Sequence, residues 1–436
     1  MMRKSNPITL FVPKLVINEI EIYLTLNPPN FKYHLIYFHY LIYQLTLMQS
    51  VHKDDEFYYF DLKHLKKVTI SNIDRYIAIL RRGQFIISDE KYKPNIKSYK
   101  YKINEIYLGN ISISHLDTNS KLGKKIIKQI YLKRSHNNRL APHLKLMYKE
   151  FMKMKFDYEG AEKWINKNAN STNELSYYVA INQIRDKRFR YYRRNKTNNR
   201  LDTNLTNLKS DLKQFIKGDY VSIDLKNSQP LLLSILIDYI LNERDTLCPY
   251  LKPSRIIKSF GIKRVKNILN FRLKEEKTKM ANFKLFYDSV LKGLLYDDFI
   301  SLYTKTVKRE EIKDIMFKVL FSKNEIYKNS PKYIPYKKEK EVFQSVYHFV
   351  YEIIKLLKTN DNRIMPIYLQ QFESYIFIDC IAKELVENGI IPFTIHDSMI
   401  VEKIHQQKAL EIMSEVFLKE ISILPTFKVE SIKEKT

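Results

Sequence analysis

The chain has 436 residues, of which 44% are hydrophobic, so it can form two or three domains with buried cores and is not a disordered protein. Its 75 Lys and Arg against 48 Asp and Glu give a net charge of +27, which favours polyanionic partners, although AT-rich coding also produces such a composition. Two distant cysteines and the lack of a signal peptide or membrane span predict a protein of a reducing compartment, without a zinc site.

Residues 1–115 form the first predicted region. Helical spacing of apolar residues from Ile73 to Leu80 is followed by two predicted strands, 85–87 and 99–103, which a polar turn joins. A helix and a basic hairpin are the outline of a winged helix, and a generic α+β domain produces the same pattern. Both interpretations remain open, and a DNA-binding role for this region depends on the first.

Residues 116–209 are predicted to be a basic linker followed by a helical region. The helical pattern ends in a dense group of cations with interleaved aromatic residues. The group consists of Arg185, Lys187, Arg188, Arg190, Arg193, Arg194, Lys196 and Arg200, with Phe189, Tyr191 and Tyr192 between them. Cations and aromatic rings together suit a phosphate backbone and exposed bases, whereas a solvated helix face is the alternative interpretation.

The segment from Val221 to Leu225 alternates apolar and polar residues, which predicts a strand with Asp224 near its end. Asn227 or Ser228 can cap the helix that follows. A carboxylate at such a strand-to-helix corner is well placed to hold a metal ion. An aspartate in this position is more often only a helix cap, so the segment alone is a weak signal.

A second aspartate lies between two short apolar strands. Residues 391–402 predict a hairpin whose tip holds His396, Asp397 and Ser398. An aspartate at a hairpin tip is ordinarily part of the turn. The apolar strands on both sides indicate a buried sheet, and we expect this sheet to bring Asp397 beside Asp224.

A third pattern places two cations and two aromatic residues at steps of four. Arg309, Lys313, Phe317 and Phe321 would lie along one stripe of a helix. Such a stripe could bind a triphosphate at one end and a sugar or base at the other. The alternative is an amphipathic helix whose cations extend to solvent.

In order and content, these segments resemble the family A polymerases, which include bacterial DNA polymerase I and the single-subunit RNA polymerases of phages and mitochondria. The resemblance covers residues 185–436. It rests on Asp224 for the first metal-binding motif, on Arg309, Lys313 and Phe321-Ser322 for the fingers motif, and on His396-Asp397-Ser398 for the second metal-binding motif. Residues 197–208 resemble the segment that meets template and primer, and 369–374 resemble a helix that touches both. Nothing before residue 185 resembles the family's proofreading exonuclease.

The resemblance implies an α+β fold of the right-hand polymerase type, with palm and fingers in residues 210–436 and a helical thumb within 116–209. It implies a template-dependent DNA polymerase that uses two Mg²⁺ ions, or Mn²⁺, on Asp224 and Asp397, with the carbonyl of Leu225 completing one site. Arg309 and Lys313 would bind the triphosphate, and Lys313 would be the acid for the leaving group. Phe317 would pack on the sugar and Phe321 would guard the insertion site.

The partners implied are a DNA template-primer and nucleoside triphosphates, in the cytoplasm of a bacterial or phage-infected cell and in the replication of a phage or mobile element. The expected nucleic-acid contacts are Arg188, Arg190, Arg193, Arg194, Arg200, Gln370 and His396. No membrane partner is expected.

Sugar preference is the main point on which the chain departs from the family. Gln229 stands where the DNA enzymes carry Glu and the RNA enzymes Gly, and Phe321 lacks the hydroxyl of the usual Tyr. Both features favour deoxynucleotides, whereas Ser398 is usual in the RNA enzymes. We therefore expect a DNA polymerase with imperfect sugar discrimination. An RNA polymerase or primase is the first alternative, and a non-catalytic nucleic-acid-binding replication protein is the second.

Overall fold

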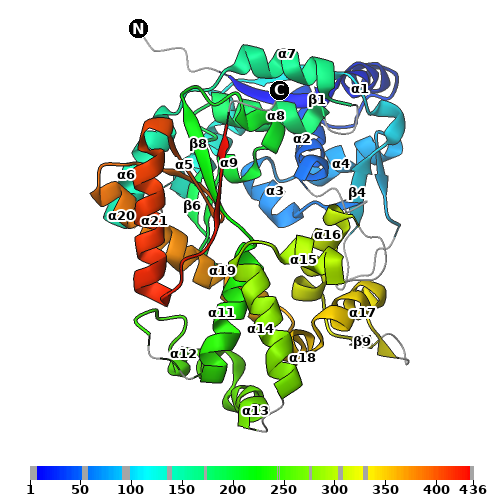
Figure 1. Ribbon diagram of the computed structural model, residues 1–436. Coiled ribbons are helices and arrows are strands. Elements are labelled where there is room, and N and C mark those ends of the chain that lie inside the picture. The colour runs from blue at the N-terminus through cyan, green and yellow to red at the C-terminus, as the bar shows by residue number, and fades with distance from the viewer. Residues whose placement is uncertain are drawn as a thin grey trace.

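A four-stranded antiparallel sheet lies in the middle of the molecule, with strand order β11-β12-β8-β13 (Figure 1). The computed structural model describes residues 7–51, 57–90, 99–134, 140–170, 174–242, 244, 246–273, 277–302, 308–327 and 332–432. Over these residues the protein is a helix-rich α+β fold with several small sheets. The four strands are β8 (Tyr220–Leu225), β11 (Phe393–Ile395), β12 (Ser398–Glu402) and β13 (Phe427–Ser431).

Strand β8 confirms the alternation that the sequence predicts. Val221, Ile223 and Leu225 are buried, whereas Ser222 and Asp224 lie half-buried on the other face. Successive side chains of a strand point to opposite faces, so one face joins the core and the other presents polar groups. The apolar face thereby anchors Asp224 in a rigid position.

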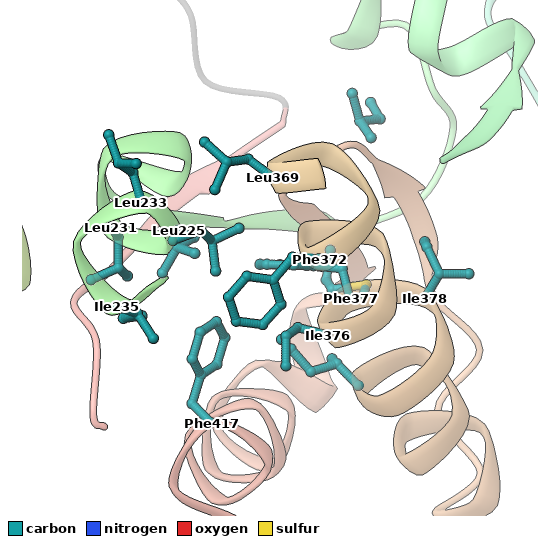
Figure 2. Packing of buried hydrophobic residues seen from close by; sticks show 14 of the residues in the cluster. Leu225, Leu231, Leu233, Ile235, Leu369, Phe372, Ile376, Phe377, Ile378 and Phe417 are labelled. Carbon is teal, nitrogen blue, oxygen red and sulfur yellow. The ribbon is translucent and has the colours of Figure 1, made fainter. Parts of the chain in front are cut away.

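Two helices pack against the end of β8, beside Leu225. These are α11 (Ser228–Asn242) and α19 (Ile364–Ser374), and the latter continues through a π-helical segment (Tyr375–Ile381) into α20 (Ala382–Glu387). Figure 2 shows Leu225 and the first turns of α11 beside Phe372, with Phe417 of α21 (Gln406–Ile421) below. The rings of Phe377 and Phe417 lie 6.1 Å apart, edge to face. This packing holds the π-helical continuation of α19 against α21.

The remaining C-terminal elements are mostly helices, which lie below the sheet in Figure 1. They are α12 (Pro253–Phe260), α13 (Ile262–Leu273), α14 (Lys277–Leu291), α15 (Leu295–Leu302), α16 (Arg309–Phe321), α17 (Lys337–Val346) and α18 (His348–Leu357). Two-residue strands β9 (Ile326–Tyr327) and β10 (Lys332–Tyr333) pair with each other, and a 3₁₀ turn (Lys403–His405) precedes α21.

The region before β8 begins with helices, which are followed by a hairpin and two short helices. Its elements are α6 (Pro142–Lys153), α7 (Tyr158–Asn168), α8 (Glu174–Arg185), β6 (Tyr192–Arg194), β7 (Leu201–Thr203), α9 (Asn204–Asn207) and α10 (Ser210–Lys213). The helical pattern is confirmed as far as Arg185. The basic group beyond it lies on a loop and on the β6–β7 hairpin, so the helix-face interpretation of that group is wrong.

The N-terminal region has its own hydrophobic core, to which Val179 of α8 also belongs. Its elements are β1 (Ile8–Pro13), α1 (Lys14–Leu26), α2 (Leu35–Val51), β2 (Tyr58–Tyr59), α3 (Leu62–Val68), α4 (Ile73–Arg82), β3 (Ile86–Ser88), β4 (Lys100–Ile103), a 3₁₀ turn (Glu105–Tyr107), β5 (Ile111–Leu116) and α5 (Lys121–Arg134). Strands β1 and β5 form one sheet, and β2, β4 and β3 form another in that order.

The helix and the hairpin that the N-terminal sequence predicts are present as α4 and β3–β4, and β2 adds a third strand that was not predicted. Most of the polar turn between the two strands falls outside the described residues. The winged-helix interpretation stays a prediction. No helix in the described part of the chain is long and apolar enough to cross a membrane.

Candidate active site

The two aspartates singled out in the sequence meet at one end of the central sheet. In the antiparallel pair of β12 and β8, Ser398 lies opposite Asp224. His396 and Asp397 form the two-residue turn between β11 and β12, and His396 adopts a left-handed φ of 55°. The backbone N–H of Leu225 donates a hydrogen bond to the carbonyl of Asp397 at 3.2 Å. Asp397 therefore lies against the residue that follows Asp224.

Two serine hydroxyls position the carboxylate of Asp224. The Ser222 hydroxyl donates to the two carboxylate oxygens of Asp224 at 3.3 and 3.2 Å, and it lies 2.6 Å from the Ser398 hydroxyl. Ser222 is on the same face of β8 as Asp224, and Ser398 reaches it from the neighbouring strand. Ser398, the neighbour of Asp397, thus helps to orient Asp224 through Ser222.

Negative charge is concentrated around Asp397. Burial raises the pKa of its carboxyl, and the nearby carboxylates of Glu373 and Asp224 raise it further, while Arg200 opposes them. A divalent cation between such carboxylates would compensate this charge. Among the described residues no three His, Cys, Asp or Glu side chains gather as a metal site, so the candidate ligands are two carboxylates. This donor set suits Mg²⁺, which commonly uses one or two carboxylates and keeps several waters.

Glu373 is a site residue that sequence reasoning missed. It lies on α19, is only 1% exposed, and forms an ion pair with Arg200 at 2.6 Å. Its second carboxylate oxygen accepts hydrogen bonds from the Ser228 hydroxyl at 2.9 Å and from the Gln229 amide. The sequence does indicate that Glu373 is buried, because it is four residues after Leu369 and three before Ile376, on the apolar stripe of its helix.

Several polar atoms of the site are buried but make no hydrogen bond within the described residues. They are Oε1 of Gln229, Nδ1 of His396 and Nδ2 of Asn227. Burial lowers the pKa of His396, and the positive charge of Arg200 lowers it further, so its ring is neutral near pH 7. Buried polar groups are usually satisfied, so these atoms indicate a place where a ligand or water binds.

The stripe of two cations and two aromatic residues forms the exposed face of α16, as the sequence predicts. Arg309 and Lys313 are exposed, Phe317 is 61% exposed, and Phe321 is half-buried with its ring 4.7 Å from that of Phe317. The opposite face of the helix is buried in the core. The stripe is therefore available to a ligand along most of its length.

Tyr296 of α15 lies against the cations of this helix and was not predicted from the sequence, because no motif contains it. Its ring lies 5.5 Å from the Arg309 guanidinium and 5.8 Å from the Lys313 ammonium. Burial raises the pKa of Tyr296, and the charges of Arg309 and Asp397 act on it in opposite directions. Arg309 also pairs with Asp297 at 3.4 Å. The cations of α16 and Asp397 thus both lie within electrostatic reach of one tyrosine.

The predicted nucleic-acid contacts do not form a single face, and Arg190 requires a correction. Arg190 is 3% exposed, and its guanidinium donates to the carbonyls of Ile184, Phe151, Met152 and Met154 at 2.7–3.1 Å. A guanidinium that is buried and satisfied in this way cannot reach a phosphate, so we remove Arg190 from the interface.

The other arginines of the group differ in their surroundings. Arg188 is held by Asp186 and by the carbonyl of Pro7. Arg193, which is 69% exposed, pairs with Asp202 at 2.9 Å, and Arg194 pairs with Asp379 at 2.8 Å. Surface pairs of this kind contribute little stability, so Arg193 can exchange its partner for a phosphate.

The segment before β7 rests on α19. The Asn198 amide donates to Gln370 at 3.1 Å, and the Gln371 amide donates to the carbonyl of Thr197 at 2.6 Å. With the Arg200–Glu373 ion pair, these contacts bring the two segments that resemble template and primer contacts side by side. Arg200 and Gln370 therefore belong to one neighbourhood, and the charge of Arg200 also acts on His396.

No protein family matches this chain, and no curated protein matches it in sequence. Among solved structures, the chain is similar to the POL domain of Pol1 from M. smegmatis, solved in complex with DNA primer-template and dNTP, at 11% sequence identity and a TM-score of 0.25. The similarity covers 70% of this chain and 65% of that one, so this chain spans less than two thirds of the length of its structural neighbour. A similarity of this size does not refine the fold class, which is helix-rich α+β.

Proposed function

We propose that this protein is a template-dependent DNA polymerase that extends a primer by nucleotidyl transfer. The observation that supports it most is the meeting of Asp224 and Asp397 at one end of the sheet, from strands far apart in the sequence. In this proposal the central sheet is the palm, α12–α18 belong to the fingers, and the helical part of 116–209 is the thumb. A role in replication of a phage or mobile element is part of the proposal.

Asp224 and Asp397 would hold two divalent metal ions, Mg²⁺ or Mn²⁺. When bound, such ions lower the pKa of an attacking hydroxyl and neutralise charge on a triphosphate. Ser222 supports the proposal because it orients the carboxylate of Asp224 from the side. The carbonyl of Leu225, whose N–H is bonded to Asp397, is the proposed backbone ligand.

The cations of α16 would bind the phosphates of the incoming nucleotide. Arg309 and Lys313 are exposed beside Tyr296, which is itself within electrostatic reach of Asp397. Positive groups fixed near developing phosphate charge stabilise a phosphoryl-transfer transition state. Lys313 is the proposed acid that protonates the leaving pyrophosphate. Phe317, one turn beyond Lys313, would pack on the sugar, and Phe321, two turns beyond it, would guard the insertion site.

The template and primer would contact the neighbourhood of Arg200, Gln370 and His396, and then the β6–β7 hairpin with Arg193 and Arg194. A neutral His396 suits contact with the primer terminus, because its ring can donate or accept one hydrogen bond. Arg188 is largely held by protein partners, namely Asp186 and the carbonyl of Pro7.

An RNA polymerase or primase is the alternative, and one observation favours it. Oε1 of Gln229 is buried without a hydrogen-bond partner in the described part of the chain and could accept a hydrogen bond from a ribose 2′-hydroxyl. In the DNA polymerase proposal, Gln229 is instead a wall against that hydroxyl. A non-catalytic nucleic-acid-binding protein would not need both aspartates at one sheet end.

The deciding experiment is primer extension with the purified chain on a primed DNA template in Mg²⁺, with dNTPs and NTPs in separate reactions. We expect extension with dNTPs and weaker extension with NTPs. Asp224→Asn is the control for a contaminating polymerase. Preferential NTP use would favour the RNA polymerase alternative, and DNA binding without extension under any condition would favour the non-catalytic one.

A further inference from the structure

We infer that Glu373 is a positioning residue that holds Gln229 as a rigid wall beside the sugar of the incoming nucleotide. This inference rests on the proposed function and gives a role to Glu373, which lies in the segment 369–374 but was not assigned a role from the sequence. Glu373 is on α19, whereas Gln229 is in the first turn of α11. The inference therefore assigns sugar selection to a contact between two helices rather than to one side chain.

The carboxylate of Glu373 uses both of its oxygens. Oε1 accepts from Arg200, with distances of 2.9 Å to Nε and 2.6 Å to the terminal nitrogen. Oε2 accepts from the Ser228 hydroxyl at 2.9 Å and from Nε2 of Gln229. A buried carboxylate is stable only when it is paired and hydrogen-bonded, and this set of donors meets that requirement. Arg200 thus compensates the charge, and Oε2 remains directed at α11.

This arrangement determines the orientation of the Gln229 amide. The NH₂ end must face Glu373, because the carbonyl end would bring two acceptors together. Oε1 of Gln229 is then fixed on the far side, where it is buried and has no partner within the described residues. A side chain that is bonded at one end cannot rotate away from an approaching sugar without breaking the bond to a buried charge.

The helices that carry the two residues are themselves firmly packed. Leu231 of α11 and Phe372 of α19 belong to one buried cluster, and Figure 2 shows these two helices facing each other beside Leu225. Ser374, the neighbour of Glu373, donates to the carbonyl of Asn199, so the next residue on α19 is anchored as well. Because the two helices share one buried core, Gln229 has little room to move with its partner.

The test compares Glu373→Gln with wild type in primer extension, using the ratio of kcat/KM for NTP to that for dNTP. Glu373→Gln keeps the volume and removes the charge, so we expect the NTP/dNTP ratio to rise on the order of tenfold as Gln229 loosens. The rise should come mainly from a lower KM for NTP. Ser228→Ala is the matched control, since it removes another donor from the same carboxylate oxygen and leaves the Gln229 contact intact.

A double variant separates positioning from a general structural effect. If Glu373 acts through Gln229, then Glu373→Gln should change the ratio little when Gln229→Gly is already present. The inference would be overturned if Glu373→Gln raised the NTP/dNTP ratio equally with and without Gln229. It would also be overturned if Ser228→Ala raised the ratio by the same amount. So would an unchanged ratio in a folded Glu373→Gln enzyme that still extends primers. Absence of extension by the wild type would instead contradict the proposed function itself.

Discussion

Ser398 lies directly opposite Asp224 in the antiparallel pair of β12 and β8, which places Asp397 one residue beyond this register position. Register in a sheet specifies which side chains share a face, and a slip of one residue would turn Asp224 toward the core. The Ser222 hydroxyl, 2.6 Å from that of Ser398, ties the two strands together on the polar face. The geometry of the candidate site is thus a property of strand pairing.

We expect Asp224→Ala and Asp397→Ala each to abolish nucleotide incorporation. Loss of a metal ligand removes transition-state stabilisation of several kcal/mol, which corresponds to a rate loss of roughly a thousandfold or more. Single-nucleotide incorporation should be measured beside the circular dichroism of each variant. Ser222→Ala is the matched control and should lose far less, because it only orients Asp224. Near-normal incorporation by either aspartate variant would remove it from the metal site.

Lys313→Ala should lower the incorporation rate by roughly 10²–10⁴-fold, the usual contribution of a positioned acid. Arg309→Ala should instead raise KM for the nucleotide, because its charge is farther along the stripe and is shared with Asp297. Single-turnover kinetics over a range of nucleotide concentrations distinguish the two effects. An exposed lysine of α17, changed as Lys338→Ala, is the control. Equal losses in all three variants would indicate a solvent-facing helix without a specific role.

The cations from Arg190 to Lys196 should behave in two different ways. Changing the exposed cations Arg193 and Lys196 to Gln should weaken template-primer binding and flatten its salt dependence by about 0.9 per lost phosphate contact. Arg190→Ala should instead reduce the free energy of unfolding by roughly 3 kcal/mol, because several buried carbonyls lose a charged donor.

The measurements are DNA affinity as a function of salt and denaturant unfolding. Lys163 and Lys167, exposed on α7, provide a control pair of equal charge. If the Arg193 and Lys196 variant keeps the wild-type salt slope, the β6–β7 hairpin lies outside the nucleic-acid path.

Gln229→Gly separates the two polymerase alternatives because they predict opposite signs. If Gln229 is a wall, its removal admits the 2′-hydroxyl and should raise the NTP/dNTP ratio on the order of a hundredfold. If Oε1 of Gln229 recognises a ribose, its removal should lower NTP use and leave dNTP use almost unchanged. Competition between the two nucleotides on one primed template measures the ratio directly. A lowered ratio would transfer the assignment to an RNA polymerase.

Lys358 predicts an unusual dependence of stability on pH. It is 3% exposed and donates to the carbonyl of Val319 near the end of α16 at 2.6 Å, and burial lowers its pKa to about 7. The unfolded chain, with an ordinary lysine pKa of about 10.4, then binds more protons than the folded chain in the interval between these values. Folding stability must therefore rise with pH across that interval, by at most about 1.4 kcal/mol per pH unit.

The comparison is between wild type and Lys358→Met in denaturant unfolding from about pH 7 to pH 10. The wild type should gain stability relative to Lys358→Met as the pH rises. Lys355→Met, at an exposed position of α18, should run parallel to the wild type. A difference between wild type and Lys358→Met that does not change with pH would mean that the amine is not desolvated in the folded state.

The sequence by itself determined the local elements that carry the candidate chemistry. Strict alternation from Val221 to Leu225 is enough to predict β8, since one face of the strand must be apolar to join a core. Spacing of four from Arg309 to Phe321 likewise predicts an exposed stripe, and apolar strands around Asp397 predict its hairpin. Each of these depends on neighbours in sequence, which is why the sequence reveals them.

Only the tertiary structure decided which further residues join the two aspartates and which predicted ones do not. Arg190 and Arg193 are three residues apart in one basic run, yet one is buried under backbone carbonyls and the other is exposed on a strand. Glu373 becomes part of the site because α19 packs on α11, and Tyr296 because α15 packs on α16 and brings its ring to Arg309 and Lys313. Burial and charge compensation depend on segments far apart in the chain, and no local pattern of residues encodes those contacts.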